Sequence, residues 1–346
     1  MEALLAAELP NGEGWQFEPK WDGFRCLAMR DRAEVTLTSK SGKPLARYFP
    51  EVVEMLSGLD TKQFLLDGEL IIPTDDALSF EALQLRLHPA ESRVRKLAKE
   101  TPAELMAFDL LEQDGKSLVA ERLDKRRDKL EGFLRKNSVD GLQLSPMTCD
   151  RNIALGWLER SGGALDGVIA KRSDLGYRSG ERAMIKVKQQ RTADCVVGGF
   201  RYGEKRLAQP VLGTREDGSR EVGSLLLGLY DDQGLLDHVG FTSAIPSAER
   251  SKLTRELEAL IEAPGFTGDA PGGPSRWNRE RTGKWEPLKP LLVVEVRYDQ
   301  VTGRRFRHGT GFLRWRPDKE PKQCTFEQLA PELHPSELKE LFGRNP

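Results

Sequence analysis

EPKWDGFR, at residues 18–25, is the segment that decides how this chain is interpreted. Lys20 is followed by Asp22-Gly23, a pair that favours tight reversals of the backbone, so we expect the lysine to sit at a turn facing a cleft. A lysine becomes a nucleophile only when it loses its proton, which burial or neighbouring cations promote. Arg25 and the two lysines of residues 186–188 are candidates for that role. Taken alone, such a segment more often marks a surface lysine beside a turn.

The length and composition indicate an ordinary globular protein. The 346 residues predict about two domains. Hydrophobic residues make up 38% and charged residues 31%, a mixture typical of neither disordered nor membrane proteins. No apolar run approaches the ~20 residues that cross a bilayer, and the acidic residues 1–8 lack the features of a secretory signal. We therefore expect a cytoplasmic protein without a membrane span.

The cysteines and the charges narrow the possible sites further. Four cysteines are widely separated: Cys26, Cys149, Cys195 and Cys324. Their spacing favours free thiols over a zinc site or a disulfide framework. The formal net charge is −1, so only a local basic cluster could bind nucleic acid. One such cluster comprises Arg304, Arg305, Arg307, Arg314, Arg316, Lys319 and Lys322.

The spacing of apolar residues predicts an α+β chain of two domains. In the first half, strands are expected at 64–73, 105–111, 167–170 and 183–188, and helices at 79–86, 91–100, 121–135 and 151–160. Later, short strands with Gly-rich turns are expected at 195–200, 224–230, 238–241 and 291–296, with one helix at 247–262. This second pattern predicts a five-stranded OB-fold β-barrel. The change of pattern near 189–191 gives domains 1–190 and 191–346.

Two acidic motifs are candidates for chemistry. Asp67-Gly68-Glu69 interrupts an apolar strand, and a carboxylate there needs a partner or a purpose because unpaired burial is costly. Glu69, expected at a strand end, would accept from a ribose hydroxyl or hold a metal; a turn with solvated carboxylates is the alternative. Asp166 and Lys171 bracket a short buried strand, where a carboxylate suits Mg²⁺. A salt-bridged strand is the alternative there.

Two basic motifs are candidates for binding phosphate. In residues 185–188, period-two alternation places Lys186 and Lys188 on one face of a strand, where an anion between them would relieve their repulsion. A solvated sheet face is the alternative. Residues 314–319, with the sequence RWRPDK, would neutralise a polyphosphate or face DNA. Pro317 places this motif at an edge or in a loop.

Together these motifs resemble those of the ATP-dependent DNA ligases, within the covalent nucleotidyltransferase superfamily. The matching segments occur in the family's order, at residues 20–25, 39–42, 67–69, 108–109, 166–171, 186–188 and 314–319. Two positions depart from the family pattern. Lys40 stands where the family usually has Arg, and Asp166 stands where most members have Glu. The lack of further domains resembles the compact bacterial ligases of end joining and repair.

The resemblance implies a fold and a set of roles. The first domain would be a nucleotidyltransferase (ATP-grasp-like adenylation) domain, and the second an OB fold. Lys20 would be the catalytic residue that takes AMP from ATP, with Mg²⁺ or Mn²⁺ as the metal. The implied nucleotide-binding residues are Glu18, Arg25, Lys40, Glu69, Phe108, Lys186, Lys188, Arg316, Asp318 and Lys319, and the implied metal ligands are Glu69 and Asp166.

The resemblance also implies partners, and it leaves alternatives open. The substrate would be nicked double-stranded DNA, with a repair polymerase or an end-binding protein as further partners, and the chain would be a monomer. An RNA ligase or a GTP-using capping enzyme is the nearest alternative, although capping enzymes usually have Thr in place of Trp21. An NAD-dependent ligase is disfavoured because the chain has no cysteine zinc cluster. A non-catalytic nucleic-acid-binding OB protein would need no lysine at position 20.

Overall fold

The computed structural model describes residues 1–73, 78–161, 165–189, 191–203, 220–272, 284–299, 301–302, 304–307 and 309–329. The chain divides into two compact units, Met1–Gln189 and Gln190–Pro331. The end of the predicted second domain, residues 330–346, lies outside the described residues. Among the described helices, none combines the length and the apolar character needed to cross a membrane.

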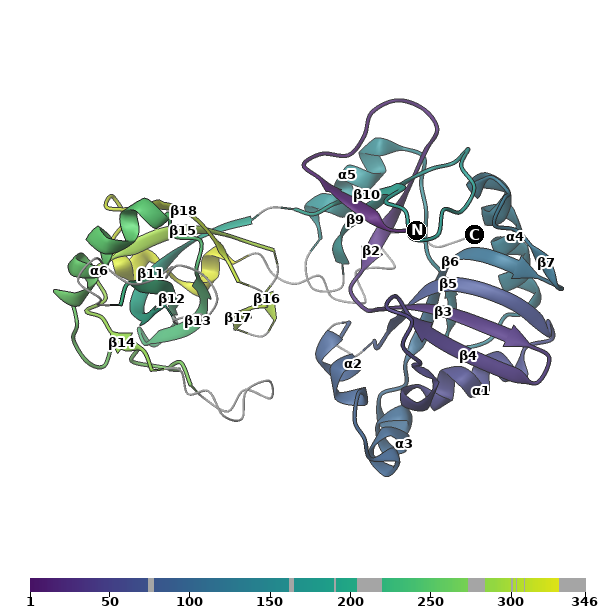
Figure 1. The fold of residues 1–346 in the computed structure, drawn as a ribbon, viewed down its shortest axis with the longest axis horizontal. Helices are drawn as coiled ribbons and strands as arrows, with labels where there is room; N and C mark the ends of the chain where they lie inside the picture. The colour runs from purple at the N-terminus through teal and green to yellow at the C-terminus, as the bar shows by residue number, and fades with distance from the viewer. Residues whose placement is uncertain are drawn as a thin grey trace. The chain divides into compact units, whose positions relative to one another are not determined.

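The larger sheet of the first unit has the strand order β4-β3-β5-β6-β7, and β8 pairs in parallel with β6. Its strands are β3 (Phe24–Asp31), β4 (Glu34–Ser39), β5 (Gln63–Ile71), β6 (Glu104–Gln113), β7 (Lys116–Ser117) and β8 (Leu142–Leu144). The accompanying helices are α1 (Pro50–Gly58), α2 (Phe80–Arg86), α3 (Glu91–Glu100) and α4 (Leu123–Lys136), shown in Figure 1. In the core, the rings of Phe64 and Phe133 meet edge to face, with their centroids 5.1 Å apart.

A smaller sheet of the first unit has the order β1-β10-β9-β2. Its members are β1 (Ala3–Ala6), β2 (Trp15–Trp21), β9 (Leu165–Arg172) and β10 (Met184–Val187), and α5 (Arg151–Glu159) packs on it. Phe17, Val168 and Trp157 are buried between this sheet and α5. Because β2 pairs antiparallel with β9, segments about 150 residues apart in the sequence lie side by side. This pairing sets the position of the candidate site.

The four helices predicted for the first domain are confirmed as α2 to α5, but α1 and the strands β1 to β4 were not predicted. The sequence does carry a signal for α1. Pro50 occupies the first turn, where a missing N–H costs nothing. Val52 and Leu56, one turn apart, are both buried. The helix is short, so its apolar residues are too few to stand out by periodicity.

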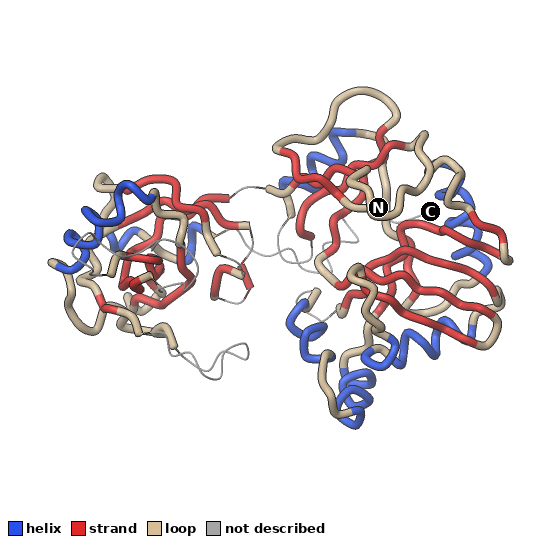
Figure 2. The backbone as a smooth tube through the Cα atoms, viewed as in Figure 1, coloured by secondary structure: helices blue, strands red, loops and turns tan. Residues whose placement is uncertain are grey.

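The second unit consists mainly of strands, as Figure 2 shows. Its main path is β13-β12-β11-β15-β18, with β14 also paired to β11. The bounds are β11 (Arg191–Tyr202), β12 (Val222–Tyr230), β13 (Leu236–Thr242), β14 (Glu286–Pro287), β15 (Val293–Tyr298) and β18 (Gly311–Trp315). A separate pair comprises β16 (Val301–Thr302) and β17 (Arg305–Phe306). A bridge between Thr242 and Thr310 links the end of β13 to the start of the segment that forms β18.

The helix predicted at 247–262 is shorter than expected. A 3₁₀ turn (Ser247–Glu249) leads into α6 (Arg250–Glu258), whose Leu253 and Leu257 are buried. Beyond α6, Ile261 forms a β-bridge with Leu288, and Pro264 cannot continue a helix. The backbone therefore leaves the helix before residue 262.

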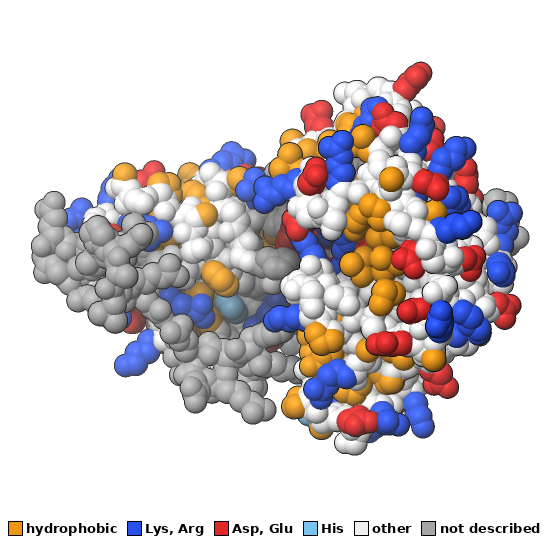
Figure 3. All heavy atoms as spheres, turned by 45° about the vertical axis from the view of Figure 1, so that its right-hand side comes forward, with side chains coloured by type: hydrophobic (Ala, Val, Ile, Leu, Met, Phe, Trp, Pro, Cys, Tyr) orange, Lys and Arg blue, Asp and Glu red, His pale blue; other side chains and the backbone are white. Residues whose placement is uncertain are grey.

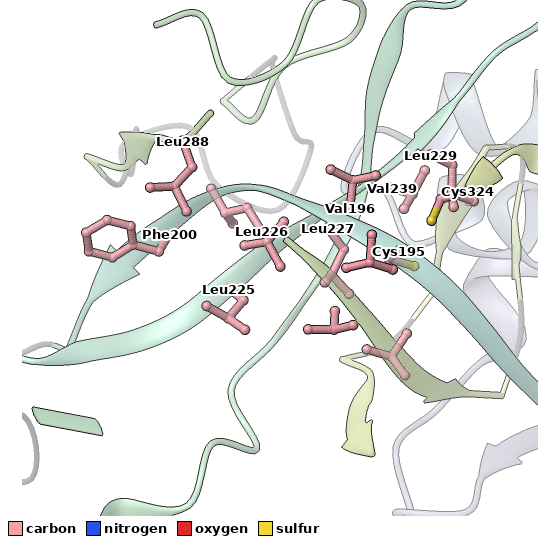
Figure 4. Packing of buried hydrophobic residues seen from close by; sticks show 14 of the residues in the cluster. Cys195, Val196, Phe200, Leu225, Leu226, Leu227, Leu229, Val239, Leu288 and Cys324 are labelled. Carbon is pink, nitrogen blue, oxygen red and sulfur yellow. The ribbon is translucent and has the colours of Figure 1, made fainter. Parts of the chain in front are cut away.

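Consecutive apolar residues of β11 and β12, buried on both faces, form much of the core of the second unit, part of which is shown in Figure 4. Phe200, Leu225 and Leu227 are fully buried there. Gly198 is required by this packing, since an added Cβ would lie 2.6 Å from the ring of Phe266. All four cysteines are free thiols, and Cys149 alone is exposed.

Candidate active site

Lys20 is the penultimate residue of β2, and the bend at Asp22-Gly23 follows it. The prediction that the lysine itself sits at the turn is therefore wrong by about two residues. Gly23 passes so close to β5 that an added Cβ would lie 2.2 Å from the carbonyl oxygen of Leu70. Only glycine fits there, and it lets the chain bend from β2 of the smaller sheet into β3 of the larger one.

Asp166 on β9 is the direct partner of Lys20. The Lys20 ammonium donates to Asp166 Oδ2, and Lys188 Nζ lies 2.9 Å from Asp166 Oδ1. Burial favours a higher pKa for this carboxyl group, but the two lysines outweigh burial and hold the pKa below its usual value. The Lys20 side chain is 23% exposed and that of Asp166 is 11% exposed. The nucleophile candidate is thus reachable from solvent while its partner is largely covered.

Lys186, on β10, lies in the same positive field. Burial, and then the charges of Lys20, Lys188 and Lys40, lower the pKa of its ammonium group. Lys188 follows directly after the last residue of β10. Lys40 is more exposed than these three and lies 3.7 Å from Glu2 Oε1. The structure therefore gathers the four lysines predicted in the first domain around one site. This cluster of positive charge does not extend over the whole first unit. On the face seen in Figure 3, basic and acidic side chains are mixed.

Glu69 lies within β5, two residues before its end, and not at the strand end that we predicted. Burial raises its pKa to about 8, against the opposing effect of Lys20 and Arg25. Arg25 stands opposite Glu69 in the sheet but donates its hydrogen bonds to Asp67, the Met1 carbonyl and the Tyr177 hydroxyl. Without a further cation, Glu69 is thus largely protonated near neutral pH.

Asp67 and Tyr177 were not predicted as site residues. The Arg25 guanidinium donates to both carboxylate oxygens of Asp67, at 3.0 and 2.6 Å. The Tyr177 hydroxyl donates to Asp67 Oδ2 at 2.8 Å. Asp67 is fully buried, and such a fork of two hydrogen bonds fixes the guanidinium in one plane. An acidic residue inside an apolar strand was the sequence signal that could have identified Asp67. Nothing in the sequence identifies Tyr177 as the partner of Asp67.

Glu18, on β2, forms a buried ion pair with Lys171 of β9. Their Oε2 and Nζ atoms are 2.6 Å apart, and Gln16 Nε2 donates to Glu18 Oε1 at 2.7 Å. The Lys171 ammonium lies 4.5 Å from the centroid of the Phe108 ring. Hence Lys171 does not pair with Asp166, the alternative that its sequence position suggested. Gln16 was not predicted, although its period-two spacing with Glu18 and Lys20 could have indicated a shared face.

The carboxylates near Lys20 could supply only some of the ligands that a magnesium ion needs. Among the described residues there is no group of three or more His, Cys, Asp or Glu side chains that could hold a metal. Glu69 and Asp166 are both near Lys20, as their electrostatic coupling to it indicates. Mg²⁺ is commonly bound by one or two carboxylates together with phosphate oxygens and water. These two side chains match that donor set.

The basic motif of the second unit also forms a network. Arg316 Nη1 donates to Asp194 Oδ1 at 2.8 Å, and its Nη2 donates to Asp318 Oδ2 at 2.8 Å. Lys319 Nζ lies 3.3 Å from Asp194 Oδ2. Hydrogen bonding to Arg316 lowers the pKa of the exposed Asp318 to about 2. Asp194 was not predicted, because it lies more than 100 residues before the motif.

Known proteins share both parts of this arrangement. Residues 5–188 match the family described as ATP dependent DNA ligase domain, and residues 218–319 match the ATP dependent DNA ligase C terminal region. The chain is 44% identical over 340 residues to DNA ligase C2 of Mycolicibacterium smegmatis, covering 94% of this chain and 92% of that protein. It is 30% identical over 332 residues to the multifunctional non-homologous end joining protein LigD of Mycobacterium bovis, covering 94% of this chain and 37% of that protein.

Among solved structures, one described under "DNA binding with a minimal scaffold: Structure-function analysis of Lig E DNA ligases" shares the fold. Its TM-score is 0.53 at 18% identity, covering 91% of this chain and 100% of that chain. The fold and the family matches together define a nucleotidyltransferase domain followed by an OB-like domain, which confirms the predicted fold class, while closure of the second domain into a barrel stays a prediction. The chain belongs to the family of ATP-dependent DNA ligases. The capping-enzyme, NAD-dependent and non-catalytic alternatives are thereby disfavoured.

Proposed function

We propose that this enzyme seals nicks in double-stranded DNA through an AMP group carried on Lys20. The deprotonated Nζ attacks the α-phosphate of ATP, so that a P–N bond forms while the bond to pyrophosphate breaks. AMP then passes to the 5′-phosphate of the nick. The 3′-hydroxyl displaces AMP, which joins the two strands.

The observation that carries this proposal is the position of Lys20, which is held by Asp166 beside Lys188 and within the field of Lys186. Asp166 contacts Lys20 and Lys188 from one side, and an α-phosphate would contact the same ammonium groups from the other side. Lys186 and Lys188 would bind the α-phosphate, because two ammonium groups on one strand edge match its charge.

The remaining roles follow the same geometry and the family pattern. Glu18 would face the edge of adenine, Phe108 would stack on its ring, and Arg25 and Glu69 would adjoin the ribose. Lys40 would add positive charge near the phosphates. In the second unit, Arg316, Asp318 and Lys319 would orient the pyrophosphate that leaves in the first step.

Glu69 and Asp166 would hold the metal, Mg²⁺ or Mn²⁺. The ion would supply charge neutralisation at the phosphate oxygens. For Asp166 this implies exchanging at least one lysine contact for the ion, since both of its oxygens are in lysine contacts. Glu69 would lose its proton when a cation is nearby, because the cation opposes the effects of burial, Asp67 and Asp22 that raise its pKa.

The relative from Mycobacterium bovis is named an end-joining protein, and this supports a role for the present enzyme in DNA repair. We propose that it acts as a monomer in the bacterial cytoplasm, where its DNA substrate lies. A repair polymerase or an end-binding protein would be its partner there. We also propose that the adenylation domain ends near residue 190 and that the OB domain begins there.

The test is covalent labelling with α-labelled ATP, followed by mapping of the modified residue. Wild type should acquire one AMP group on Lys20, and Lys20→Ala should acquire none. Lys129→Ala, which removes an exposed lysine bound to Glu121, serves as the matched control and should label as wild type does. Undiminished labelling of Lys20→Ala would refute the assignment. Labelling with GTP instead of ATP would point to the capping-enzyme alternative, and sealing of nicked RNA in preference to DNA would point to an RNA ligase.

A further inference from the structure

Asp194 stands at the centre of the cationic network of the second unit. Its Oδ1 accepts a hydrogen bond from Arg316 Nη1 at 2.8 Å, and its Oδ2 lies 3.3 Å from Lys319 Nζ. The side chain of Asp194 is 13% exposed, whereas that of Lys319 is 29% exposed. One largely buried carboxylate therefore joins two cations that come from different places in the motif.

The backbone of Asp194 is fixed separately from its side chain. The amide of Gln328 clamps it, because Asp194 N–H donates to Oε1 at 2.7 Å and Nε2 donates to the Asp194 carbonyl at 2.9 Å. At this position β11 pairs with β15 on one edge, while its pairing with β12 begins only at Val196. Gln328 thus occupies the edge of β11 that none of the described strands covers. The carboxylate is anchored through a rigid backbone.

Each of two neighbouring carboxylates has its own cations. Glu295 on β15 stands opposite Asp194 in the sheet, and it pairs with Arg314 of β18 at 2.6 Å. Like charges on adjacent strands repel, so both carboxylates need cations. The structure divides them cleanly, with Arg314 bound to Glu295 and Arg316 bound to Asp194. Asp194 therefore serves the cations that the proposed function places at the leaving pyrophosphate.

We propose that Asp194 is a positioning residue for self-adenylation, which holds Arg316 and Lys319 side by side in the orientation that a pyrophosphate group requires. This inference rests on the proposed function of those two cations. Long cationic side chains have many rotamers, and holding two of them in one arrangement opposes both their freedom and their mutual repulsion. A fixed carboxylate between them restricts their rotamers and offsets their repulsion. Sealing of DNA that already carries AMP needs no pyrophosphate contact, so it should not depend on Asp194.

The experiment measures two steps separately in the full-length enzyme. The first is single-turnover self-adenylation with α-labelled ATP, and the second is sealing of pre-adenylated nicked DNA. Asp194→Asn should slow the first step about tenfold and raise the ATP concentration at half-maximal rate, as expected for misplaced binding groups. The second step should stay within about twofold of wild type. Asp194→Glu keeps a carboxylate and should recover part of the first step.

Glu295→Gln is the matched control, because it makes the same chemical change on the neighbouring strand and releases Arg314. Its self-adenylation should remain within about twofold of wild type. If Asp194→Asn does not fold, Gln328→Leu removes the backbone clamp, together with one hydrogen bond to the Thr325 carbonyl, and should show the same selective loss to a smaller degree. Thermal unfolding of each variant identifies losses caused by instability.

The outcomes separate this inference from the proposed function. Equal losses in both steps of Asp194→Asn would mean a structural role, and faster self-adenylation would mean that the carboxylate competes with pyrophosphate; either result overturns the inference. If Lys319→Ala slows self-adenylation but Asp194→Asn does not, the inference fails while the proposed function stands. If Lys319→Ala has no effect on self-adenylation, the proposed role of these cations fails, and the inference fails with it.

Discussion

Asp166 in the first unit and Asp194 in the second each bind two cationic side chains, and both carboxylates are mostly covered. The difference lies in the cations. Asp166 binds two lysines, one of which is the proposed nucleophile, whereas Asp194 binds a lysine and Arg316, whose guanidinium stays charged. The first arrangement is suited to covalent chemistry. The second is suited to holding positive charge in place, and their variants should differ accordingly.

The largest difference should appear when the same substitution is made at both carboxylates. Asp166→Asn should slow self-adenylation by more than about a hundredfold, because it removes the partner of the proposed nucleophile and a proposed metal ligand together. Asp194→Asn should slow self-adenylation only about tenfold. Single-turnover labelling at saturating ATP measures both rates. Losses of equal size would break the distinction between the two sites.

A second contrast concerns stability. Lys171→Met should lower the free energy of unfolding by about 3 kcal/mol, since it leaves the Glu18 carboxylate buried without its partner. Lys319→Met should lower it by less than about 1 kcal/mol, because that side chain is much more exposed. Urea unfolding followed by circular dichroism compares the two variants. Glu18→Gln combined with Lys171→Met should restore part of the loss, because no unpaired charge remains; a double variant no more stable than Lys171→Met would contradict this explanation.

Acid should weaken the second unit through His238 on β13. Both ring nitrogens are buried without a hydrogen-bond partner among the described residues, and burial, followed by Arg305 and Arg201, lowers the pKa to about 4. The folded state thus favours the neutral ring. Its contribution is present above the unfolded pKa of 6.5 and is lost as the pH falls towards 4, by about 2 kcal/mol at pH 5. Hydrogen exchange of β12 and β13 at pH 7 and pH 5 measures it. His238→Gln should remove this pH dependence, and an unchanged dependence would assign it to another group.

The sequence predicts the two sites unequally well, for a physical reason. Lys20, Asp166 and Lys188 belong to short motifs whose order is informative, and the structure does place these residues together. Asp194 and Gln328 belong to no motif, and the pairing that makes them useful spans 134 residues. Hydrogen bonds between distant strands depend on register, which local periodicity does not reveal.

The same limit applies to the fold. Helices α2 to α5 follow from apolar spacing and capping, as with Ser79 at the start of α2 and Asp150 at the start of α5. The short helix α1 and the strand position of Lys20 do not, because an Asp-Gly pair marks a reversal without fixing the residue at which the strand ends. The partners of Asp67 and Glu18 likewise depend on tertiary contacts, and they became visible only in the structure.

The smallest effect on self-adenylation is expected at Asp318, which shares Arg316 with Asp194. Asp318 is 63% exposed and Asp194 is 13% exposed, so solvent can replace Asp318 more readily as a partner of the guanidinium. Asp318→Asn should therefore slow self-adenylation only about threefold, with little change in stability. Because the pKa of Asp318 is about 2, the wild-type rate should show no titration of this group between pH 5 and pH 8. A pH–rate profile of both proteins tests this. An effect of Asp318→Asn as large as that of Asp194→Asn would mean that Arg316 is held equally from both sides, and that the buried carboxylate has no special place in positioning it.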